Sequence, residues 1–456
     1  MVMSMKILWL CNMMLPVVGV HLGLETSPKE GWLSGLLSQV LADDQNRIEQ
    51  LALAFPVSRE LLAGEGLAKG ETLILQGTLE CLGKQVEYYG FCEDTSRPEE
   101  YEEALEGTMK ELLDSCAPDI VHIFGTEYPH ALAMTRACNR PERTLIGVQG
   151  LCSLCADAYF ASLPEDVIES KTFRDILKRD SILQQQEKFR KRGENEREAI
   201  KNVGHITGRT HWDAYWTEKW NPKATYHKMN ETLRGDFYTE RWDGQQARPG
   251  AIFVSQGDYP LKGLHYMLLA MPEILGKYPE AKVYVAGNSL IKNHTLKDRL
   301  KTSGYGRYLK KLIKQLDLQD KVVFLGRLSA QQMKEQYLHS SAYVCCSSVE
   351  NSPNSLGEAM LLGMPCVAAD VGGISSLLQD GVDGILYRGF SAEHPLTAEQ
   401  IAGNLAKAIL RLWGDSAALV GYCENARNHA KITHDGRANF EKLMEIYRAM
   451  LETPRQ

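Results

Sequence analysis

The chain has 456 residues, of which 44% are hydrophobic and 24% are charged. It can bury a large core, which excludes a disordered segment and a coiled-coil rod. Its 51 basic and 58 acidic residues give a net charge of −7 at pH 7, so we expect no general attraction to nucleic acid. The 11 cysteines are spread along the chain, and we expect Cys152 and Cys155 to be ordinary thiols in a reducing compartment.

The first predicted element is a buried strand over Lys6–Cys11, which ends before Asn12. Pro16 and His21 interrupt the apolar residues that follow, and no small-residue cleavage site comes after them, so the pattern does not fit a signal peptide. No other stretch approaches the roughly 20 uninterrupted apolar residues of a membrane span. We therefore expect a cytoplasmic protein that at most lies peripherally at the inner face of a membrane.

Short apolar runs alternate with helical patterns along the rest of the chain. Most of the runs are continuously apolar, which is typical of parallel strands covered on both faces. The alternation predicts an α/β protein with doubly wound sheets. Further strands are expected at Ile48–Ala54, Ile120–Phe124, Thr144–Val148, His205–Thr207, Ala251–Val254, Lys282–Val285, Lys321–Leu325, Ala342–Cys345 and Pro365–Ala368. Helices are expected at Leu264–Tyr278, Arg307–Leu316, Ala330–His339, Glu358–Leu362 and Ala438–Leu451.

A polar stretch, Arg241–Gly250, precedes a new strand and predicts a domain boundary. We place an N-terminal domain at residues 1–243 and a second domain at 244–430. Residues 431–456 would form a C-terminal helix that packs back on the N-terminal domain. In an α/β protein of this kind, ligands bind at the carboxyl ends of the strands.

Residues Glu165–Lys201 form a long, charged helical stretch, whose basic part covers residues 171–201. Two interpretations are open. The stretch is either a solvated helical face, or a patch that docks on anionic lipid or on an acidic acceptor.

The densest chemical signal lies between Ser347 and Met360, where a strand runs into a polar loop and a helix opens near Ser355. The first N–H groups of a helix have no partner within it, so they form a ready site for phosphate. Glu350 lies in the loop and Glu358 lies one turn into the helix. Acids at a helix start often only cap it, so spacing alone leaves the role of this pair open.

The spacing of Glu350 and Glu358, with Gly363–Ala368, Asp370–Ile374 and Asp380–Gly384, resembles retaining glycosyltransferases of family 4. The resemblance implies the GT-B fold, with two Rossmann-like doubly wound domains that face a cleft. It implies retaining, metal-independent transfer of a hexosyl group from a nucleotide-diphosphate sugar, with no other cofactor. The acceptor would be a glycan or a lipid-linked hydroxyl in bacterial surface-polysaccharide synthesis.

The same resemblance implies roles for residues of the second domain. Glu350 would hold sugar hydroxyls and Glu358 the ribose hydroxyls, while the donor phosphates would lie against the N–H groups of Asn354, Ser355 and Leu356. Phe253–Gly263 resembles the loop that carries Lys262 to the donor diphosphate. Gln256 stands where the family usually has an arginine, and it can donate a hydrogen bond but no charge. Backbone groups of Gly326, Arg327 and Leu328 would read the nucleobase.

Acceptor-side residues are implied in the first domain. The loop Pro28–Gly35, with Gly31 and Trp32, resembles the family's first glycine-containing loop. In Val121–His130, Phe124 replaces a histidine of the family pattern, and Glu127 and His130 on the following loop are the expected substitutes. Arg209 is a candidate for the missing cation, with a structural salt bridge as the alternative.

Two other functions stay open at this stage. One is a nucleotide-sugar epimerase of GT-B fold, which would turn over the donor without an acceptor glycan. The other is a non-catalytic scaffold of a glycan-assembly complex, which the Gln256 and Phe124 departures favour.

Overall fold

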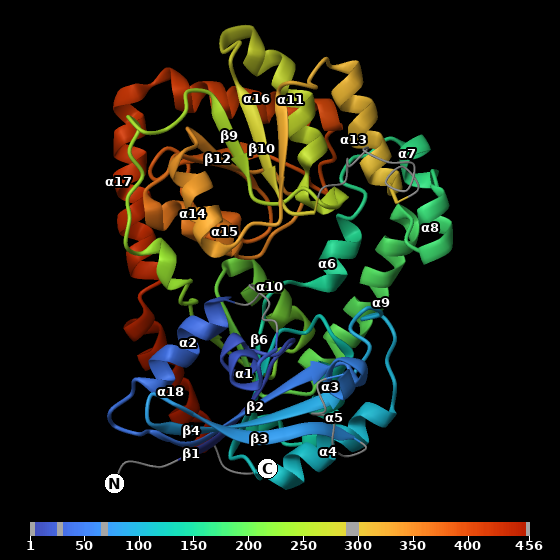
Figure 1. Cartoon of the computed structure of the whole chain (residues 1–456), viewed down its shortest axis with the longest axis vertical. Helices are drawn as coiled ribbons and strands as arrows, with labels where there is room; N and C mark the ends of the chain where they lie inside the picture. The colour runs from blue at the N-terminus through green and yellow to red at the C-terminus, as the bar shows by residue number, and fades with distance from the viewer. Residues whose placement is uncertain (1–4, 25–30, 65–71, 289–300, 453–456) are drawn as a thin grey trace. The chain divides into compact units, whose positions relative to one another are not determined.

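The computed structural model describes residues 5–24, 31–64, 72–288 and 301–452. The chain forms two compact units, each built around one sheet (Figure 1). The first unit comprises residues 1–153, 188–234 and 434–456, and the second comprises residues 154–187 and 235–433. This division differs from the expected one, because residues 154–187 belong to the second unit and its main segment begins at Gly235 rather than at residue 244.

The first unit has an eight-stranded sheet with the order β3-β4-β2-β1-β5-β6-β7-β8. All neighbouring strands are parallel except β3 and β4, which form an antiparallel hairpin. The central strand β1 lies between β2 and β5, so the winding direction of the chain changes beside it. The strands are β1 (Met5–Leu10), β2 (Ile48–Val57), β3 (Leu73–Cys81), β4 (Lys84–Cys92), β5 (Ile120–Phe124), β6 (Thr144–Gly147), β7 (His205–Gly208) and β8 (Thr225–Lys228).

The helices of the first unit cover this sheet and bury its apolar side chains. Strands β5, β6 and β7 are buried along their whole length, as expected for parallel strands covered on both faces. The helices are α1 (Pro16–Leu22), α2 (Gly31–Leu41), α3 (Arg59–Gly64), α4 (Ala104–Cys116), α5 (Pro129–Cys138), α10 (His211–Trp220) and α18 (Gly436–Glu452), with the 3-10 helix η1 (Pro141–Arg143). Helices α6 (Cys152–Asp157) and α9 (Ile182–Lys201) include residues of both units.

The second unit has a six-stranded, fully parallel sheet with the order β11-β10-β9-β12-β13-β14. The first strand of this sheet in the chain, β9, lies beside the fourth, β12. This is the doubly wound Rossmann order, and the winding direction reverses between β9 and β12. The strands are β9 (Ala251–Val254), β10 (Lys282–Ala286), β11 (Val322–Gly326), β12 (Ala342–Cys345), β13 (Cys366–Asp370) and β14 (Ile385–Arg388).

Helices surround the second sheet and complete its core. They are α7 (Glu165–Glu169), α8 (Phe173–Lys178), α11 (Leu264–Lys277), α13 (Gly304–Gln315), α14 (Ala330–Leu338), α15 (Asn354–Leu362), α16 (Ala398–Gly414) and α17 (Ser416–Thr433), with the 3-10 helices η2 (Gly235–Phe237), η3 (Pro260–Lys262) and η4 (Ile374–Ser376). The two parallel sheets confirm the predicted α/β architecture of Rossmann-like domains. None of the described helices is long and apolar enough to cross a membrane.

The charged stretch Glu165–Lys201 forms three helices rather than one. Thr172 caps α8 by accepting a hydrogen bond from the Asp175 N–H at 3.2 Å, and the Asp175 side chain accepts one from the Thr172 N–H. Ser181 and Gln184 make a similar reciprocal pair at the start of α9. These capping boxes begin new helices inside a stretch whose charge pattern looks continuous.

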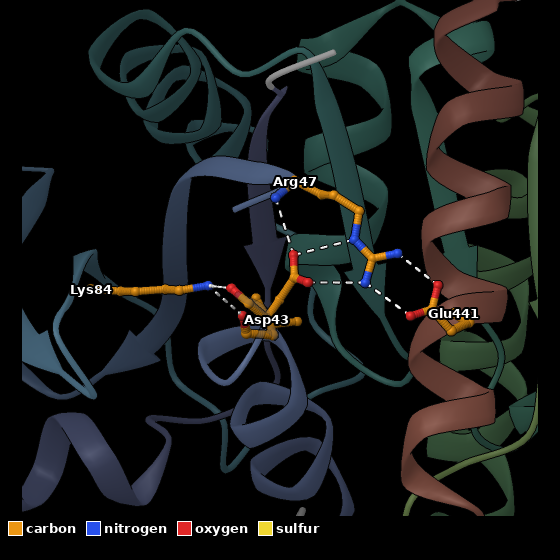
Figure 2. Close-up of polar contacts among 5 residues, drawn as sticks. Asp43, Arg47, Lys84 and Glu441 are labelled. Carbon is orange, nitrogen blue, oxygen red and sulfur yellow. Dashed lines mark hydrogen bonds and ion pairs between the residues drawn. The ribbon is translucent and has the colours of Figure 1, made fainter. Parts of the chain in front are cut away.

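The C-terminal helix α18 packs against α2 and β5 of the first unit. Its Tyr447 hydroxyl accepts a hydrogen bond from the Trp9 Nε1–H at 2.9 Å. Figure 2 shows Arg47 between two carboxylates, 3.0 Å from Asp43 Oδ1 and 2.6 Å from Glu441 Oε2. The Arg47 and Asp43 side chains are each 5% exposed, while Glu441 is 45% exposed, so a buried ion pair is linked to α18 through a partly exposed carboxylate.

Replacing Arg47 with methionine is expected to lower the free energy of unfolding by about 3 kcal/mol, because it leaves the buried Asp43 carboxylate without its cation. Lys442→Met is the matched control. Lys442 belongs to the same helix, but it pairs with Glu445 in solvent, where an ion pair contributes about 0–1 kcal/mol. Urea denaturation measures both. Equal effects of the two variants would contradict the anchoring role.

The same network is expected to weaken in acid. Burial alone would raise the pKa of Asp43, but hydrogen bonds and the charge from Arg47 outweigh it and hold the pKa below 3.8. The hydrogen bond from Arg47 also holds the pKa of Glu441 below 4.5. Carboxyl groups with a lowered folded-state pKa stabilise the fold above their unfolded-state pKa, and they lose that contribution as the pH falls through the folded value. As the pH falls below 4.5, the free energy of unfolding of the Arg47→Met variant should therefore decrease less than that of the wild type.

Candidate functional site

Two loops meet at the carboxyl edge of the second sheet, where the winding direction reverses. One follows β9 and ends in Lys262-Gly263, and the other follows β12 and contains Glu350. The Ser348 N–H donates to the Leu261 carbonyl at 2.7 Å, and the Cys346 thiol donates to the Lys262 carbonyl at 3.3 Å. Crevices at such switch points are the usual ligand sites of open α/β sheets.

Two glycines allow the backbones at this edge to approach closely. Gly263 has a φ of +67°, and a Cβ there would overlap the Cys346 carbonyl oxygen. Gly372 has a φ of +57°, and a Cβ there would overlap the carbonyl oxygen of Glu350. The Gly373 N–H donates to that oxygen at 2.9 Å. The backbone segments around Lys262 and Glu350 therefore pack so closely that only glycine fits at these two positions.

Lys262 and Glu350 form an ion pair across the two loops, with Lys262 Nζ 2.6 Å from Glu350 Oε1. The Ser347 hydroxyl donates to the same carboxylate oxygen at 2.8 Å. The two charged side chains are 20% and 14% exposed. Burial alone would lower the pKa of Lys262, but the negative charge of Glu350 and their hydrogen bond raise it, so Lys262 stays a cation. The pair holds the Lys262 ammonium group at the sheet edge, beside the carboxylate that balances its charge.

Helix α15 begins beside this ion pair and lacks a side-chain cap. Pro353 is the N-cap residue and makes no capping hydrogen bond. The Ser355 side chain is positioned by Tyr343, because its Oγ accepts a hydrogen bond from the Tyr343 hydroxyl at 2.8 Å. The Leu356 N–H donates to the Pro353 carbonyl at 3.0 Å, while Glu358 is buried one turn further on. An uncapped helix start next to a lysine suits an anion.

The residues expected at the nucleobase lie at the end of β11, and their contacts reach the loops that follow β9 and β10. Gly326 ends β11 with a φ of +77°, and Leu328 is half-buried. Arg327 is exposed, and its Nε–H donates to the Asn288 side-chain oxygen at 2.8 Å. Asn288 in turn donates to Asp258 Oδ2 at 2.9 Å. Gln256, in the same loop as Asp258, is half-buried.

A second polar cluster lies at the carboxyl edge of the first sheet, where β1 and β5 end. Asn12 follows β1, and its Nδ2–H donates to Glu127 Oε2 at 3.2 Å. His130 Nε2 is 3.2 Å from Asn12 Oδ1, and His130 Nδ1 is 2.6 Å from Glu93 Oε2. The Gly150 N–H donates to the other Glu127 oxygen at 3.2 Å. The cluster occupies the switch point of the first unit.

The structure corrects three acceptor-side expectations. His130 lies in helix α5 and is fully buried, not on an open loop. Trp32 is a core residue, and its ring packs edge-on against Phe124 with 5.7 Å between centroids. Arg209 is buried in an ion pair with Glu231 and donates to the Gln149 carbonyl at 3.0 Å, which is the structural salt bridge. Gly31 begins α2, while Pro28–Glu30 of that loop lie outside the described residues.

A narrow cavity in the first unit is lined by His122 and Arg209, whose buried Nε2 and Nε atoms have no hydrogen-bond partner among the residues that the structure describes. The other ring nitrogen of His122 is 2.8 Å from the Tyr447 hydroxyl. Burial lowers the pKa of His122 to about 3, so the ring is neutral near pH 7. No cluster of three or more metal-ligating side chains occurs within the described ranges.

Sequence reasoning assigned no site role to three polar residues of these edges: Ser347, Asn12 and Glu93. Ser347 and Asn12 each follow a predicted strand closely, so a search for polar residues at strand ends would have found them. Glu93 follows β4, which was not predicted.

Comparison with known proteins finds a family match within the second unit. Residues 239–412 match the family "Glycosyl transferases group 1". An uncharacterized glycosyltransferase of Methanocaldococcus jannaschii is 28% identical over 203 residues, which are 44% of this chain and 45% of the relative. The chain therefore spans about half the length of the curated relatives that it matches first.

Solved structures cover almost the whole chain. Sucrose-phosphate synthase from Thermosynechococcus elongatus has a TM-score of 0.63 at 14% identity, over 97% of this chain and 98% of that one. Anabaena HepE in complex with UDP-glucose has a TM-score of 0.60 at 16% identity, over 97% and 99%. Both likenesses concern the fold. The chain thus shares the GT-B fold of these structures, and its residues 239–412 match the glycosyl transferases group 1 family.

Proposed function

We propose that the chain is a retaining glycosyltransferase that moves a hexosyl group from a nucleoside-diphosphate sugar to a hydroxyl of a glycan or lipid-linked acceptor. The observation that carries this proposal is the Lys262–Glu350 ion pair beside the uncapped start of α15, at the switch point of the second sheet. A cation and free helix N–H groups are the features that bind a diphosphate.

The leaving group sets the chemistry. When the bond from the anomeric carbon to the diphosphate breaks, negative charge develops on the departing phosphate oxygen. Lys262 and the N–H groups of Asn354 and Ser355 would stabilise that charge without a metal ion. Glu350, held by Ser347 and by the Gly373 N–H, would orient the sugar hydroxyls, and Glu358 would bind the ribose.

The acceptor hydroxyl would attack from the face that the phosphate leaves, which retains the anomeric configuration. The departing phosphate oxygen can take the acceptor proton, so the proposal needs no strong protein base. We assign the acceptor side to the half-buried Glu127 in the first unit, which Asn12 holds with the buried His130 behind it, because these polar groups gather at the carboxyl edge of that sheet.

The likeness to HepE suggests which donor nucleotides should be tested first. HepE, which shares the fold, was solved with UDP-glucose, so uridine diphosphate sugars come first. We further propose that the enzyme works in the cytoplasm, at the inner face of the membrane, on a surface polysaccharide.

The experiment that tests this proposal is proton NMR of the reaction of donor sugars with a panel of glycan and lipid-linked acceptors. The scalar coupling constant of the anomeric proton in the product should show the same anomeric configuration as in the donor sugar. The Glu350→Gln variant should give no product signal. Products with inverted configuration would contradict retention. Donor turnover that gives a rearranged nucleotide sugar, with no acceptor needed, would favour an epimerase.

A further inference from the structure

Helix α8 has its polar residue inside and its apolar residues outside. Asp175 is fully buried, whereas Phe173, Ile176 and Leu177 are 63%, 64% and 74% exposed. These three positions have i, i+3 and i+4 spacing, so they form one face of the helix. A helix on the surface of a soluble domain normally has the opposite arrangement, with its apolar face towards the core. The exposed apolar face of α8 is therefore a candidate docking surface.

The exposed face is held in place by polar contacts on the buried side. Asp175 Oδ2 accepts hydrogen bonds from the Thr172 N–H at 3.0 Å and from the Gly304 N–H, at the start of α13, at 2.8 Å. These contacts fix α8 within the second unit, where α7 also packs on α13 (Figure 1). Leu183, near the start of α9, is 40% exposed and adds to the apolar residues of this region.

Exposed cations lie in the sequence at both ends of this helix. Among the described residues, no ion pair involves Lys171, Lys178 or Arg179, and all three are exposed. The acids near them, Asp175 and Asp180, are both engaged by Arg174.

The cations of α9 are less available to bind a partner, because three of them already make contacts within the chain. Lys188 pairs with Glu99, Arg190 pairs with Glu194, and Arg192 donates to the Glu127 carbonyl. Acidic residues are exposed on the preceding helix α7, at Glu165, Asp166 and Glu169. Within residues 171–179, which are α8 and its immediate flanks, the exposed charged side chains are therefore all cations.

We propose that α8 docks on the surface of an anionic lipid bilayer. Phe173, Ile176 and Leu177 enter the boundary between headgroups and acyl chains, and Lys171, Lys178 and Arg179 contact lipid phosphates. A second copy of the chain is a poorer fit, because a stable dimer buries roughly 1,600 Å² in total, far more than these few side chains offer. A symmetric pairing would also bring the same cations together. The inference does not depend on sugar transfer, since lipid binding is measured without a donor.

The test is co-sedimentation of the full chain with phosphatidylcholine vesicles that contain or lack phosphatidylglycerol. The wild type should sediment with the anionic vesicles. Ile176→Ser should weaken binding about tenfold, since it removes one inserting aliphatic side chain. The matched control is Ile432→Ser on α17, which removes an isoleucine that is 78% exposed elsewhere in the same unit, and it should change nothing.

The charge contribution is tested in the same assay. Lys178→Glu should lower binding to anionic vesicles, while Lys407→Glu, an exposed lysine on α16, should have a much smaller effect. The proposal is overturned if the wild type stays in the supernatant with both vesicle types, or if Ile176→Ser and Ile432→Ser behave alike. A concentration-dependent dimer that Ile176→Ser disperses would identify a second copy as the occupant and also overturn it.

Discussion

Replacing Lys262 with methionine is expected to lower the rate of nucleoside diphosphate release from a sugar donor by about 10²–10³-fold, the usual cost of losing one group that stabilises developing charge. Lys262 is the cation of the ion pair with Glu350 at the switch point of the second sheet. Methionine keeps most of the side-chain volume, so the loss reports the missing charge. The measurement is the rate of diphosphate release at saturating donor.

Two controls give this result its meaning. Lys407→Met removes an exposed lysine of the same unit, and it should leave the rate unchanged. Urea denaturation of Lys262→Met should show a folded protein, because the Ser347 hydroxyl still donates to Glu350. A folded Lys262→Met variant with an undiminished rate would mean that the lysine does not face the leaving group.

Gly263→Ala is expected to destabilise the fold by about 3 kcal/mol or more. The residue has a φ of +67°, and the new Cβ would overlap the Cys346 carbonyl oxygen. The left-handed conformation alone costs an L-residue about 1–2 kcal/mol, and the overlap adds to this because a backbone atom cannot rotate away. The change also separates the two loops that bring Lys262 to Glu350, so activity should fall with stability.

Gly326→Ala is the matched control for the second prediction. Gly326 has a similar φ of +77°, but no atom of the described residues lies within 4 Å of a Cβ built there. It should therefore lose only the conformational cost of about 1–2 kcal/mol. Urea denaturation of both variants measures the difference. Equal losses would show that the close approach at Cys346 has no energetic weight.

The parts of the fold that were predictable from the sequence are those whose environment leaves a local pattern. β5 and β12 were predicted with their observed limits, because strands covered on both faces are continuously apolar. The hairpin of β3 and β4 was missed, since both strands mix buried residues with exposed or half-buried ones and β3 is the edge strand of the sheet. The helix breaks at Thr172 and Ser181 depend on capping contacts that a charge pattern does not show.

The candidate site was predictable to a similar extent. Lys262 and Glu350 each follow a predicted strand, and the Rossmann order of the second sheet makes those two strands neighbours. The first unit was harder, because the cluster of Asn12, Glu93 and His130 joins three segments that are distant in sequence. Its geometry depends on the strand order, and one of its strands had no recognisable pattern. Trp32 and Arg209 are buried by such long-range packing, which no local motif encodes.

Calorimetric titration of uridine, guanosine and adenosine diphosphates onto the full chain tests the central claim most directly, because it needs no acceptor. We expect one of the three to bind the wild type. Lys262→Met should bind it about 10–100-fold more weakly, the effect of losing one charge-assisted hydrogen bond, and Glu358→Gln should also weaken it. No binding of any nucleotide, or equal binding by the wild type and both variants, would contradict a donor site between β9 and β12.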